Sequence, residues 1–292
     1  MVQGAGMTLY EEVRAALRET AFRPRKRLGQ NFLIHERVIE SILRLLDLGS
    51  NDAVVEIGPG LGFLTRRLLE RAERVLAVEI DPVLFERLRH SEFAASSKLR
   101  LIHGDILEVA LPALLPERKI KLAGNLPYSI STPVLFRVFD WRDYISTLVL
   151  MVQKEVADRI AAAPGTKDYG TLSVWCQAHG RVTDKLSVSP EAFFPRPKVR
   201  STVLKIELFD APLIAEDEIP LLRGLVRAAF GQRRKTLGNA LSAWLKGGRD
   251  EIEDFLRSQG VDPKRRGETL SIQEFIKLAR VASSRFLLTT DG

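Results

Sequence analysis

The 292-residue sequence has only one cysteine and four histidines. A single thiol, Cys176, excludes an internal disulfide and any zinc site that needs several cysteines. Its apolar neighbours indicate an ordinary buried side chain. The histidines are scattered without the spacing of metal ligands, at positions 35, 90, 103 and 179. We therefore expect no metal.

Long hydrophobic runs are also missing. The nearest candidate, residues 147–152, is strand-sized and far short of the roughly 18 residues that a membrane span needs. The N-terminus lacks the basic-then-apolar pattern of a secretory signal, and residues 1–20 predict a polar tail followed by an amphipathic helix. No coiled-coil repeat or exposed apolar stripe requires a dimer. We expect a cytoplasmic monomer that does not contact a membrane.

The charge is basic: 44 Lys and Arg against 37 Asp and Glu give a formal net charge of +7. Phosphate contacts supply most of the sequence-independent affinity for nucleic acids, so this balance suits a polyanionic partner. A merely soluble basic protein is the alternative. The clustering of the charges favours nucleic acid, because compact basic groups lie beside Gly or Pro at 23–27, 196–200, 233–235 and 264–266.

The chain is too long for one small core, which predicts a large domain and a smaller one. From about residue 30, short apolar runs alternate with amphipathic stretches, the pattern of a mostly parallel sheet covered by helices. Strands are predicted at 53–57, 75–80, 99–102, 120–123 and 146–153, and helices at 34–48, 63–72, 83–93 and 132–141. Two more strands, at 172–178 and 201–208, lack intervening helices and are predicted to form an antiparallel edge.

After Phe209 the pattern changes to helices only, separated by glycine and proline breakers. These helices are predicted at 221–230, 236–244, 251–258 and 272–286. We therefore predict three parts: an N-terminal extension over residues 1–24, an α/β catalytic domain over 25–211, and a small all-helical domain over 212–292.

A glycine-rich turn, Gly-Pro-Gly-Leu-Gly at 58–62, follows the first predicted strand of the sheet. Glycine lets the backbone turn sharply and approach a ligand, although the spacing is not the G-x-G-x-x-G of dinucleotide sites. Glu79 ends the next strand, where a carboxylate can accept from both ribose hydroxyls. Asp105 follows the third strand, where it can accept from an adenine amine. Both carboxylates could instead cap helices, but together with the turn they favour an adenosine cofactor.

The fourth strand leads into Asn125-Leu-Pro-Tyr128. The exocyclic amine of a purine is a poor nucleophile because its lone pair is delocalised into the ring. The Asn125 side-chain oxygen and the Leu126 carbonyl can accept its N–H groups and favour a pyramidal nitrogen. Pro127 fixes the turn, and Tyr128 offers a face on which a flipped base stacks. The alternative is a plain turn beside a core tyrosine.

These segments, taken in order, resemble the ribosomal RNA adenine N6,N6-dimethyltransferases. The matching segments are LGQNFL (28–33), EIGPGLG (56–62), VEID (78–81), GDIL (104–107), NLPY (125–128), FFPRPKVRS (193–201) and FGQRRKTL (230–237). The resemblance covers roughly residues 25–285, and the basic segment at 232–237 is more similar to the small-subunit (16S) branch than to the large-subunit (23S) antibiotic-resistance branch.

The resemblance implies a Rossmann-like methyltransferase domain that uses S-adenosyl-L-methionine. It implies methylation of N6 on two adjacent adenosines near the 3′ end of 16S rRNA in the small ribosomal subunit, giving N6,N6-dimethyladenosine, with a role in subunit biogenesis. The implied cofactor residues are Gln30, Asn31, Leu33, Gly58, Gly60, Glu79, Asp105, Ile106 and Asn125. The target adenine is expected at Asn125, Leu126, Pro127 and Tyr128, with Phe194 stacked on its other side. RNA is expected at Arg196, Lys198, Arg233, Arg234 and Lys235.

Three other functions are compatible with parts of the sequence. A nicotinamide-dependent dehydrogenase would share the fold and Glu79 but not the glycine spacing, and it leaves residues 125–128 unexplained. A large-subunit adenine methyltransferase would differ only in its RNA. A non-catalytic RNA-binding assembly factor would keep the fold, but intact Glu79, Asp105 and Asn125 speak against it. Methyl transfer itself requires mainly alignment and exclusion of water, so no tuned general base is expected near Asn125.

Overall fold

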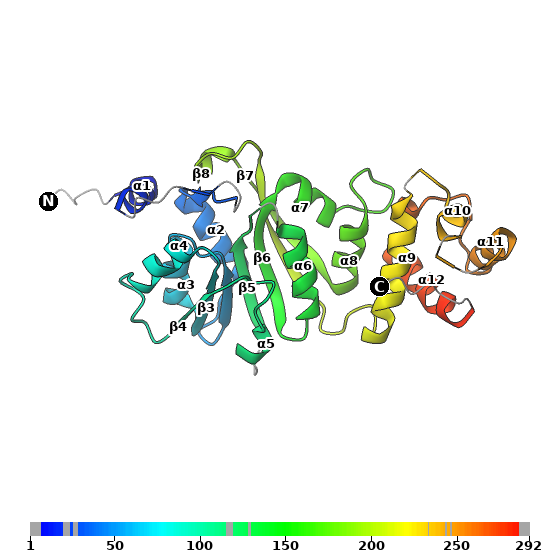
Figure 1. Cartoon of the computed structure of the whole chain (residues 1–292), viewed down its shortest axis with the longest axis horizontal. Coiled ribbons are helices and arrows are strands. Elements are labelled where there is room, and N and C mark those ends of the chain that lie inside the picture. The colour runs from blue at the N-terminus through cyan, green and yellow to red at the C-terminus, as the bar shows by residue number, and fades with distance from the viewer. Residues whose placement is uncertain are drawn as a thin grey trace. The chain divides into compact units, whose positions relative to one another are not determined.

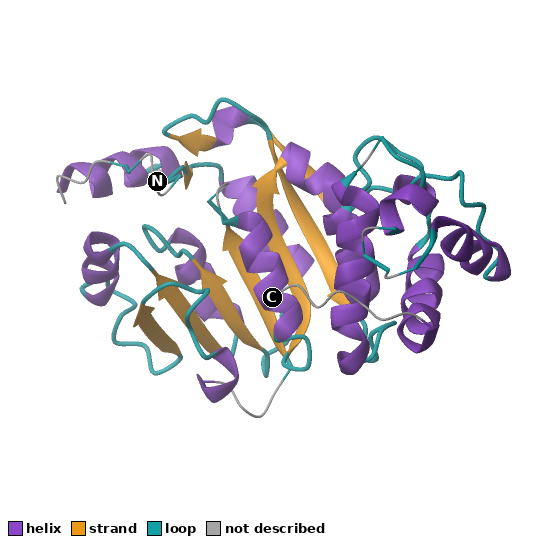
Figure 2. Cartoon of the chain, turned by 45° about the vertical axis from the view of Figure 1, so that its right-hand side comes forward, coloured by secondary structure: helices purple, strands orange, loops and turns teal. Residues whose placement is uncertain are grey.

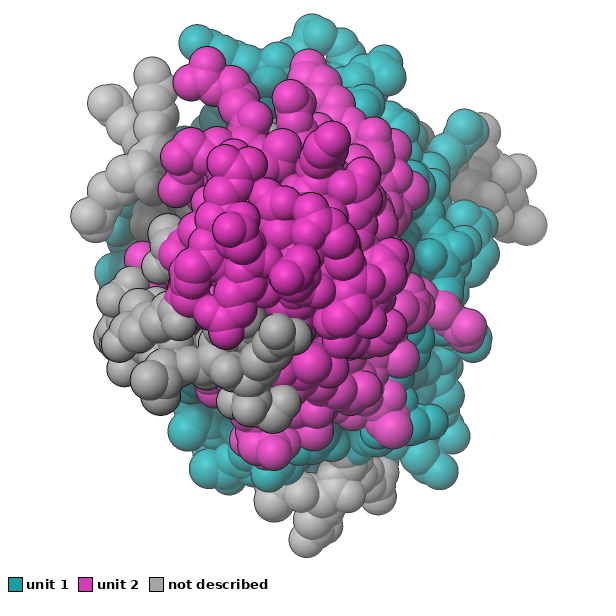
Figure 3. All heavy atoms as spheres, turned by 90° about the vertical axis from the view of Figure 1, so that its right-hand side faces the viewer, with its two compact units in different colours: residues 1–157, 182–210 teal, residues 158–181, 211–292 magenta. Residues whose placement is uncertain are grey.

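The computed structural model describes residues 7–19, 24–25, 29–114, 119–127, 130–232, 234–242, 244–245 and 247–285. The chain divides into two compact units, coloured separately in Figure 3. The first unit contains residues 1–157 and 182–210, and the second contains 158–181 and 211–292. The second unit therefore combines the C-terminal helices with a segment that precedes the last strands of the sheet.

The first unit is built on a seven-stranded sheet in the order β4-β3-β2-β5-β6-β9-β7 (Figure 1). The parallel strands are β2 (Ala53–Ile57), β3 (Arg74–Glu79), β4 (Leu99–His103), β5 (Ile120–Asn125) and β6 (Ile145–Gln153). The strand β9 (Ser201–Leu208) pairs antiparallel with β6, and β7 (Gly180–Val188) lies beyond it at the edge. This order confirms the predicted mostly parallel sheet.

Helices before and between the parallel strands cover the two faces of the sheet (Figure 2). They are α2 (Glu36–Leu46), α3 (Phe63–Arg71), α4 (Pro82–Arg89), the short α5 (Leu111–Leu114) and α6 (Ser131–Asp140). In α2 the buried residues Ile39, Ile42, Leu43 and Leu46 recur at helical spacing and pack with Val54 of β2. Burial of each such side chain contributes about 1.5–3 kcal/mol, so the apolar stripe decides how the helix lies.

The parallel strands end side by side, and hydrogen bonds continue past their last residues. Gly58 N–H donates to the Val78 carbonyl (2.9 Å), Gly104 N–H to the Glu79 carbonyl (3.0 Å) and Leu126 N–H to the Met151 carbonyl (3.0 Å). The loops that carry the predicted site residues therefore leave the sheet from fixed positions along one edge.

One predicted strand is wrong. Residues 172–178 lie in α8 (Thr171–His179), and the edge beyond β6 is formed by β9, which is antiparallel to β6, and by β7. The segment is short and apolar on almost every side, and all but one of the residues from Leu172 to His179 are buried, so its periodicity could not separate a strand from a buried helix. The preceding helix α7 (Lys154–Ile160) was not predicted.

The N-terminal segment belongs to the first unit. It contains α1 (Leu9–Glu19) and the two-residue strand β1 (Phe32–Leu33), which pairs antiparallel with β8 (Phe193–Phe194). A capping box starts α1: Thr8 N–H donates to the Glu11 carboxylate (2.8 Å), and the Thr8 hydroxyl accepts from Glu11 N–H (3.3 Å). The predicted amphipathic helix is present.

The second unit is helical, as predicted for the C-terminal region. Its helices are α8, α9 (Ile219–Gly231), α10 (Leu237–Leu241), α11 (Arg249–Ser258) and α12 (Ile272–Arg285). Backbone hydrogen bonds tie residues 158–181 to the rest of the unit, from Gly165 N–H to the Glu268 carbonyl (2.7 Å) and from Leu213 N–H to the Ala178 carbonyl (3.1 Å). No helix in the described part of the chain is both long and apolar enough to cross a bilayer.

Candidate cofactor and acceptor site

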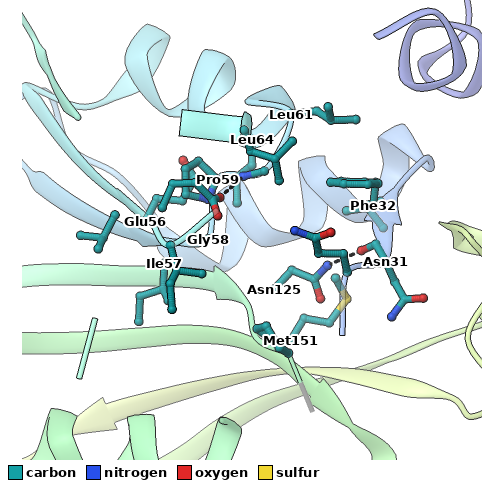
Figure 4. A pocket seen from close by; sticks show the side chains of 18 of the residues that line it. Asn31, Phe32, Glu56, Ile57, Gly58, Pro59, Leu61, Leu64, Asn125 and Met151 are labelled. Carbon is teal, nitrogen blue, oxygen red and sulfur yellow. Dashed lines mark hydrogen bonds between the residues drawn. The ribbon is translucent and has the colours of Figure 1, made fainter. Parts of the chain in front are cut away.

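A pocket lies at the carboxyl edge of the sheet, where β2, β3, β4 and β5 end (Figure 4). It contains about 1060 Å³ of empty space, including its open mouth. All of the residues predicted to bind the cofactor line it: Gln30, Asn31, Leu33, Gly58, Gly60, Glu79, Asp105, Ile106 and Asn125. Segments that are far apart in the sequence thus meet in one cavity, which is the arrangement expected for ligand sites of open parallel sheets.

The glycine turn forms one wall of this pocket. Gly58 and Gly60 have φ angles of 67° and 61°, in the left-handed region that favours glycine. A Cβ atom on Gly60 would lie 3.3 Å from the ring of Phe32, whereas one on Gly58 would meet no atom within 4 Å. Gly60 is therefore needed for close packing of the N-terminal segment, and Gly58 leaves open space beside the backbone for a ligand.

Glu79 lies in the wall with its carboxylate already oriented. One oxygen accepts from Gly60 N–H (2.9 Å) and the other from Asp81 N–H (2.8 Å). Burial raises the pKa of Glu79, and the backbone donors partly oppose that shift. The helix-cap alternative does not describe Glu79, because Asp81 caps α4 by accepting from Val83 N–H and Leu84 N–H.

Asp105 does not cap a helix, because the next helix, α5, begins only at Leu111. Its Oδ1 accepts from Leu107 N–H (2.9 Å) and stabilises the turn that follows β4. The residue also lines the pocket, next to Gly104, where an added Cβ would meet no atom within 4 Å. Ile80, at the end of β3, is 46% exposed in the same wall and offers an apolar surface for a flat ring.

Glu56, which the sequence analysis gave no role, is a buried acid under the glycine turn. It is 2% exposed, and the Thr65 hydroxyl donates to its Oε2 (2.6 Å). Burial, together with the charge of nearby Glu79, raises the pKa of Glu56 to about 8, although the Thr65 hydrogen bond opposes part of the shift. At neutral pH Glu56 is therefore mostly protonated, which keeps two adjacent negative charges out of the pocket wall.

The side chain of Gln30 holds the N-terminal segment in place. Its Oε1 accepts from Arg25 N–H (2.7 Å) and its Nε2 donates to Asp81 Oδ2 (3.0 Å), which also lies 3.3 Å from the Arg25 guanidinium. Asp81 is fully buried and joins this segment to the start of α4. Sequence reasoning missed its role, although the Asp-Pro pair at a helix start is a recognisable capping signal.

Asn125, which is predicted to hold the target adenine, lines the pocket at the end of β5, and we call this wall the acceptor side. Its Nδ2 donates to the main-chain carbonyl of Asn31 (2.9 Å), a contact visible in Figure 4. A carbonyl can only accept, so this bond fixes the amide with Oδ1 turned away from Asn31. The turn behind it is held by bonds from Leu126 N–H to Met151 and from the Ser131 hydroxyl to the Pro127 carbonyl (3.2 Å). Pro127 lines the pocket, and Tyr128 lies outside the described residues.

The residues predicted to contact RNA are distributed over both units. Phe194 is half-buried and pairs with Phe32 across β1 and β8. Arg196 and Lys198 are exposed in the same unit, and the Arg196 guanidinium is paired with Glu191. In the second unit, Arg234 and Lys235 are exposed, whereas Arg233 lies outside the described residues.

Comparisons with known proteins agree with this geometry. The sequence model of the ribosomal RNA adenine dimethylase family matches residues 21–283. The chain is 46% identical over 268 residues to the ribosomal RNA small subunit methyltransferase A of Geobacter metallireducens, covering 90% of this chain and 97% of that protein.

Two solved structures share the fold. One is a dimethyladenosine transferase from Plasmodium falciparum, with a TM-score of 0.75 and 24% identity over 87% of this chain and 98% of the other. The second is the 23S rRNA methyltransferase ErmE, with a TM-score of 0.66 and 24% identity over 87% of this chain and 100% of the other. Because both identities are below 25%, these two structures show the methyltransferase fold only. They do not indicate which RNA this chain methylates.

Proposed function

The chain belongs to the ribosomal RNA adenine dimethylase family, and from this membership we propose its reaction and substrate. It transfers methyl groups from S-adenosylmethionine to N6 of two adjacent adenosines near the 3′ end of 16S rRNA in the small ribosomal subunit. The product is N6,N6-dimethyladenosine, and the modification serves small-subunit biogenesis. The observation that carries the proposal is the single pocket that joins the glycine turn and Glu79 to Asn125.

The pocket residues fit this cofactor. Glu79 presents a buried, preoriented carboxylate suited to the ribose hydroxyls. The open space beside Gly58 suits the methionine portion, and Ile80, Ile106 and Asp105 suit the face and amine of an adenine. When bound, S-adenosylmethionine supplies a methyl group made reactive by its sulfonium.

Asn125 would hold the target nitrogen in line for transfer. Its Oδ1, turned away from Asn31, is available to accept one N–H of the adenine amine, and the Leu126 carbonyl would accept the other. Two acceptors favour a pyramidal nitrogen, whose lone pair is no longer delocalised into the purine. The segment containing Asn31 also lines the pocket, so it would help to exclude water while it orients Asn125.

The exposed basic side chains would bind the ribosomal RNA through its phosphates. Arg196 and Lys198 extend from the segment that carries Phe194, and Arg234 and Lys235 supply charge in the helical unit. Such contacts recognise shape and backbone, because side chains cannot read the deep groove of an RNA duplex.

The test is methyl transfer from labelled S-adenosylmethionine to small ribosomal subunits that lack the modification, with protein-free large-subunit RNA assayed in parallel. We expect label in the small subunit and two methyl groups on each target adenine. Label in large-subunit RNA alone would keep the chemistry and overturn the substrate. Cofactor binding without any transfer would favour a non-catalytic assembly factor.

A further inference from the structure

The N-terminal helix α1 carries a row of three side chains that face solvent. Tyr10, Arg14 and Arg18 are spaced four residues apart, so they lie on one face of the helix, and all three are exposed. The Arg14 guanidinium lies 5.7 Å from the centre of the Tyr10 ring and donates to its hydroxyl (3.4 Å). Arg18 Nε donates to the Arg14 carbonyl (3.2 Å). We call this row the Tyr10 stripe.

Charge is segregated around this helix. Two of its acids are paired with arginines of neighbouring helices, Glu12 with Arg66 of α3 (3.4 Å) and Glu19 with Arg87 of α4 (3.7 Å). A third, Glu11, is exposed and accepts from Thr8 in the capping box. Within the described part of the chain, neither arginine of the stripe forms an ion pair with a carboxylate. The side of α1 that faces solvent therefore carries the two positive charges of the stripe against the single negative charge of Glu11 near the start of the helix.

The stripe begins beside the ring that is predicted to stack on the target adenine. The rings of Tyr10 and Phe194 meet edge to face, with centroids 6.1 Å apart and planes at 71°. The opposite face of α1 is anchored, because Val13 and Ala16 are buried in a cluster with Phe32. Phe32 itself lines the cofactor pocket. The helix thus has a fixed position next to both parts of the site.

We infer that the Tyr10 stripe binds the single-stranded RNA that flanks the target adenosine. Arg14 and Arg18 lie one helical turn apart, roughly 6 Å along the axis, and can face successive phosphates of an extended strand. Tyr10 offers a ring to a neighbouring base. Aromatic rings interleaved with basic side chains are the usual means of binding single strands. This inference rests on the proposed function, since it assumes that the acceptor is RNA at Phe194.

The main test compares two double variants with equal loss of charge. Arg14→Ala with Arg18→Ala removes the stripe's charge, and Arg37→Ala with Arg44→Ala removes two exposed arginines of α2 that have no carboxylate partner among the described residues. Binding to unmethylated small ribosomal subunits is measured over a range of salt concentrations. We expect the stripe variant to bind roughly tenfold more weakly at physiological salt, with a salt slope reduced by about 1.4, as expected for two lost contacts to single-stranded phosphates.

A second pair isolates the ring. Tyr10→Ala should raise KM for the subunit about fivefold, the lower range of a lost base stack, whereas Tyr10→Phe keeps the ring and should stay within twofold. Affinity for S-adenosylhomocysteine, measured by calorimetry, should be unchanged in every variant. The affinity for S-adenosylhomocysteine would fall in these variants if the role of α1 were only to support the cofactor pocket.

The inference is overturned if the stripe variant binds like the wild type, or if both double variants lose affinity equally, which would mean a dependence on net charge alone. It is also overturned if Tyr10→Ala lowers cofactor affinity as much as RNA affinity. Failure of the wild-type protein to methylate small subunits in the same assay would instead overturn the proposed function.

Discussion

The cofactor side and the acceptor side of the pocket are built in different ways. On the cofactor side, the residues follow consecutive strand ends, and the backbone itself orients them: Gly60 and Asp81 N–H groups hold the Glu79 carboxylate. On the acceptor side, the key bond joins Asn125 to Asn31, 94 residues apart in sequence. Phe194, the predicted stacking residue, lies beside Phe32 of the pocket wall through pairing of β8 with β1. The strand-end part of the cofactor side therefore depends on local structure, whereas the orientation of Asn125 depends on the N-terminal segment. Variants should separate the two functions.

The largest separation is expected from Asn125→Ala. The variant should bind S-adenosylhomocysteine within about twofold of wild type but lose at least about 100-fold in the single-turnover rate, similar to the loss of one preorganised polar group in other active sites. Ser131→Ala is a matched control, because Ser131 bonds to the Pro127 carbonyl of the same turn but does not line the pocket. Unchanged methyl transfer in Asn125→Ala would remove this residue from the mechanism.

Glu79→Gln should have the opposite effect, in that it weakens cofactor binding and largely preserves the transfer rate. An amide has one acceptor oxygen where the carboxylate has two, so it cannot accept from both backbone N–H groups and also from a ribose. We expect cofactor affinity to fall by about 1.5–3 kcal/mol, the usual value of a hydrogen bond to a charged group, measured by calorimetry. At saturating cofactor the methyl-transfer rate should change much less. A variant that keeps its cofactor affinity but loses its rate would contradict this division of roles.

A smaller effect, confined to RNA, is expected from Arg233→Ala combined with Arg234→Ala. Loss of two phosphate contacts should weaken binding to small subunits by roughly tenfold at physiological salt, with cofactor affinity unchanged. The control is Arg249→Ala with Arg257→Ala, which removes equal charge from the second unit but only from side chains already paired with Glu253. Equal loss of cofactor and RNA affinity would argue against a separate RNA surface.

A last effect concerns stability, not binding or transfer, and sharpens the picture of the cofactor side. The pKa of Glu56 rises from 4.5 to about 8 on folding because the side chain is buried. The folded state therefore binds a proton that the unfolded state releases, and this group lowers stability as pH rises from about 4.5 to about 8. Glu56→Gln cannot ionise and keeps an acceptor for Thr65. The melting temperature of Glu56→Gln minus that of the wild type should increase as pH rises through that interval. A constant difference would mean that Glu56 is already charged in the folded state over the same pH range.

Much of the sheet was predictable because each strand is a short apolar run and each helix a periodic one. The runs at 53–57 and 201–208 match β2 and β9, and the motif positions at the strand ends do line one pocket. The segment at 172–178 was assigned incorrectly because almost all of its side chains are buried, so no polar face marked it as a helix. Burial on all sides removes the periodic signal on which such predictions depend.

The roles of Gln30 and Asp81 show a second limit. Both residues lie in segments that were recognised, yet the contact between the Gln30 amide and the Asp81 carboxylate joins positions 51 residues apart. The sequence around Gln30 does not indicate a contact with Asp81, and the sequence around Asp81 does not indicate a contact with Gln30. The same holds for Tyr10 and Phe194, whose edge-to-face contact follows from the packing of α1 and not from any motif.

Local sequence was therefore sufficient for the parallel sheet, the glycine turn and the acidic strand ends, because these features depend on residues adjacent along the chain and on backbone conformation. Tertiary structure alone determined which way the Asn125 amide faces, why Glu56 retains its proton and where α1 lies. Each of these depends on a partner or a degree of burial supplied by a distant segment. Hydrogen-bond orientation and desolvation are properties of the packed molecule, and they arise only when those segments meet.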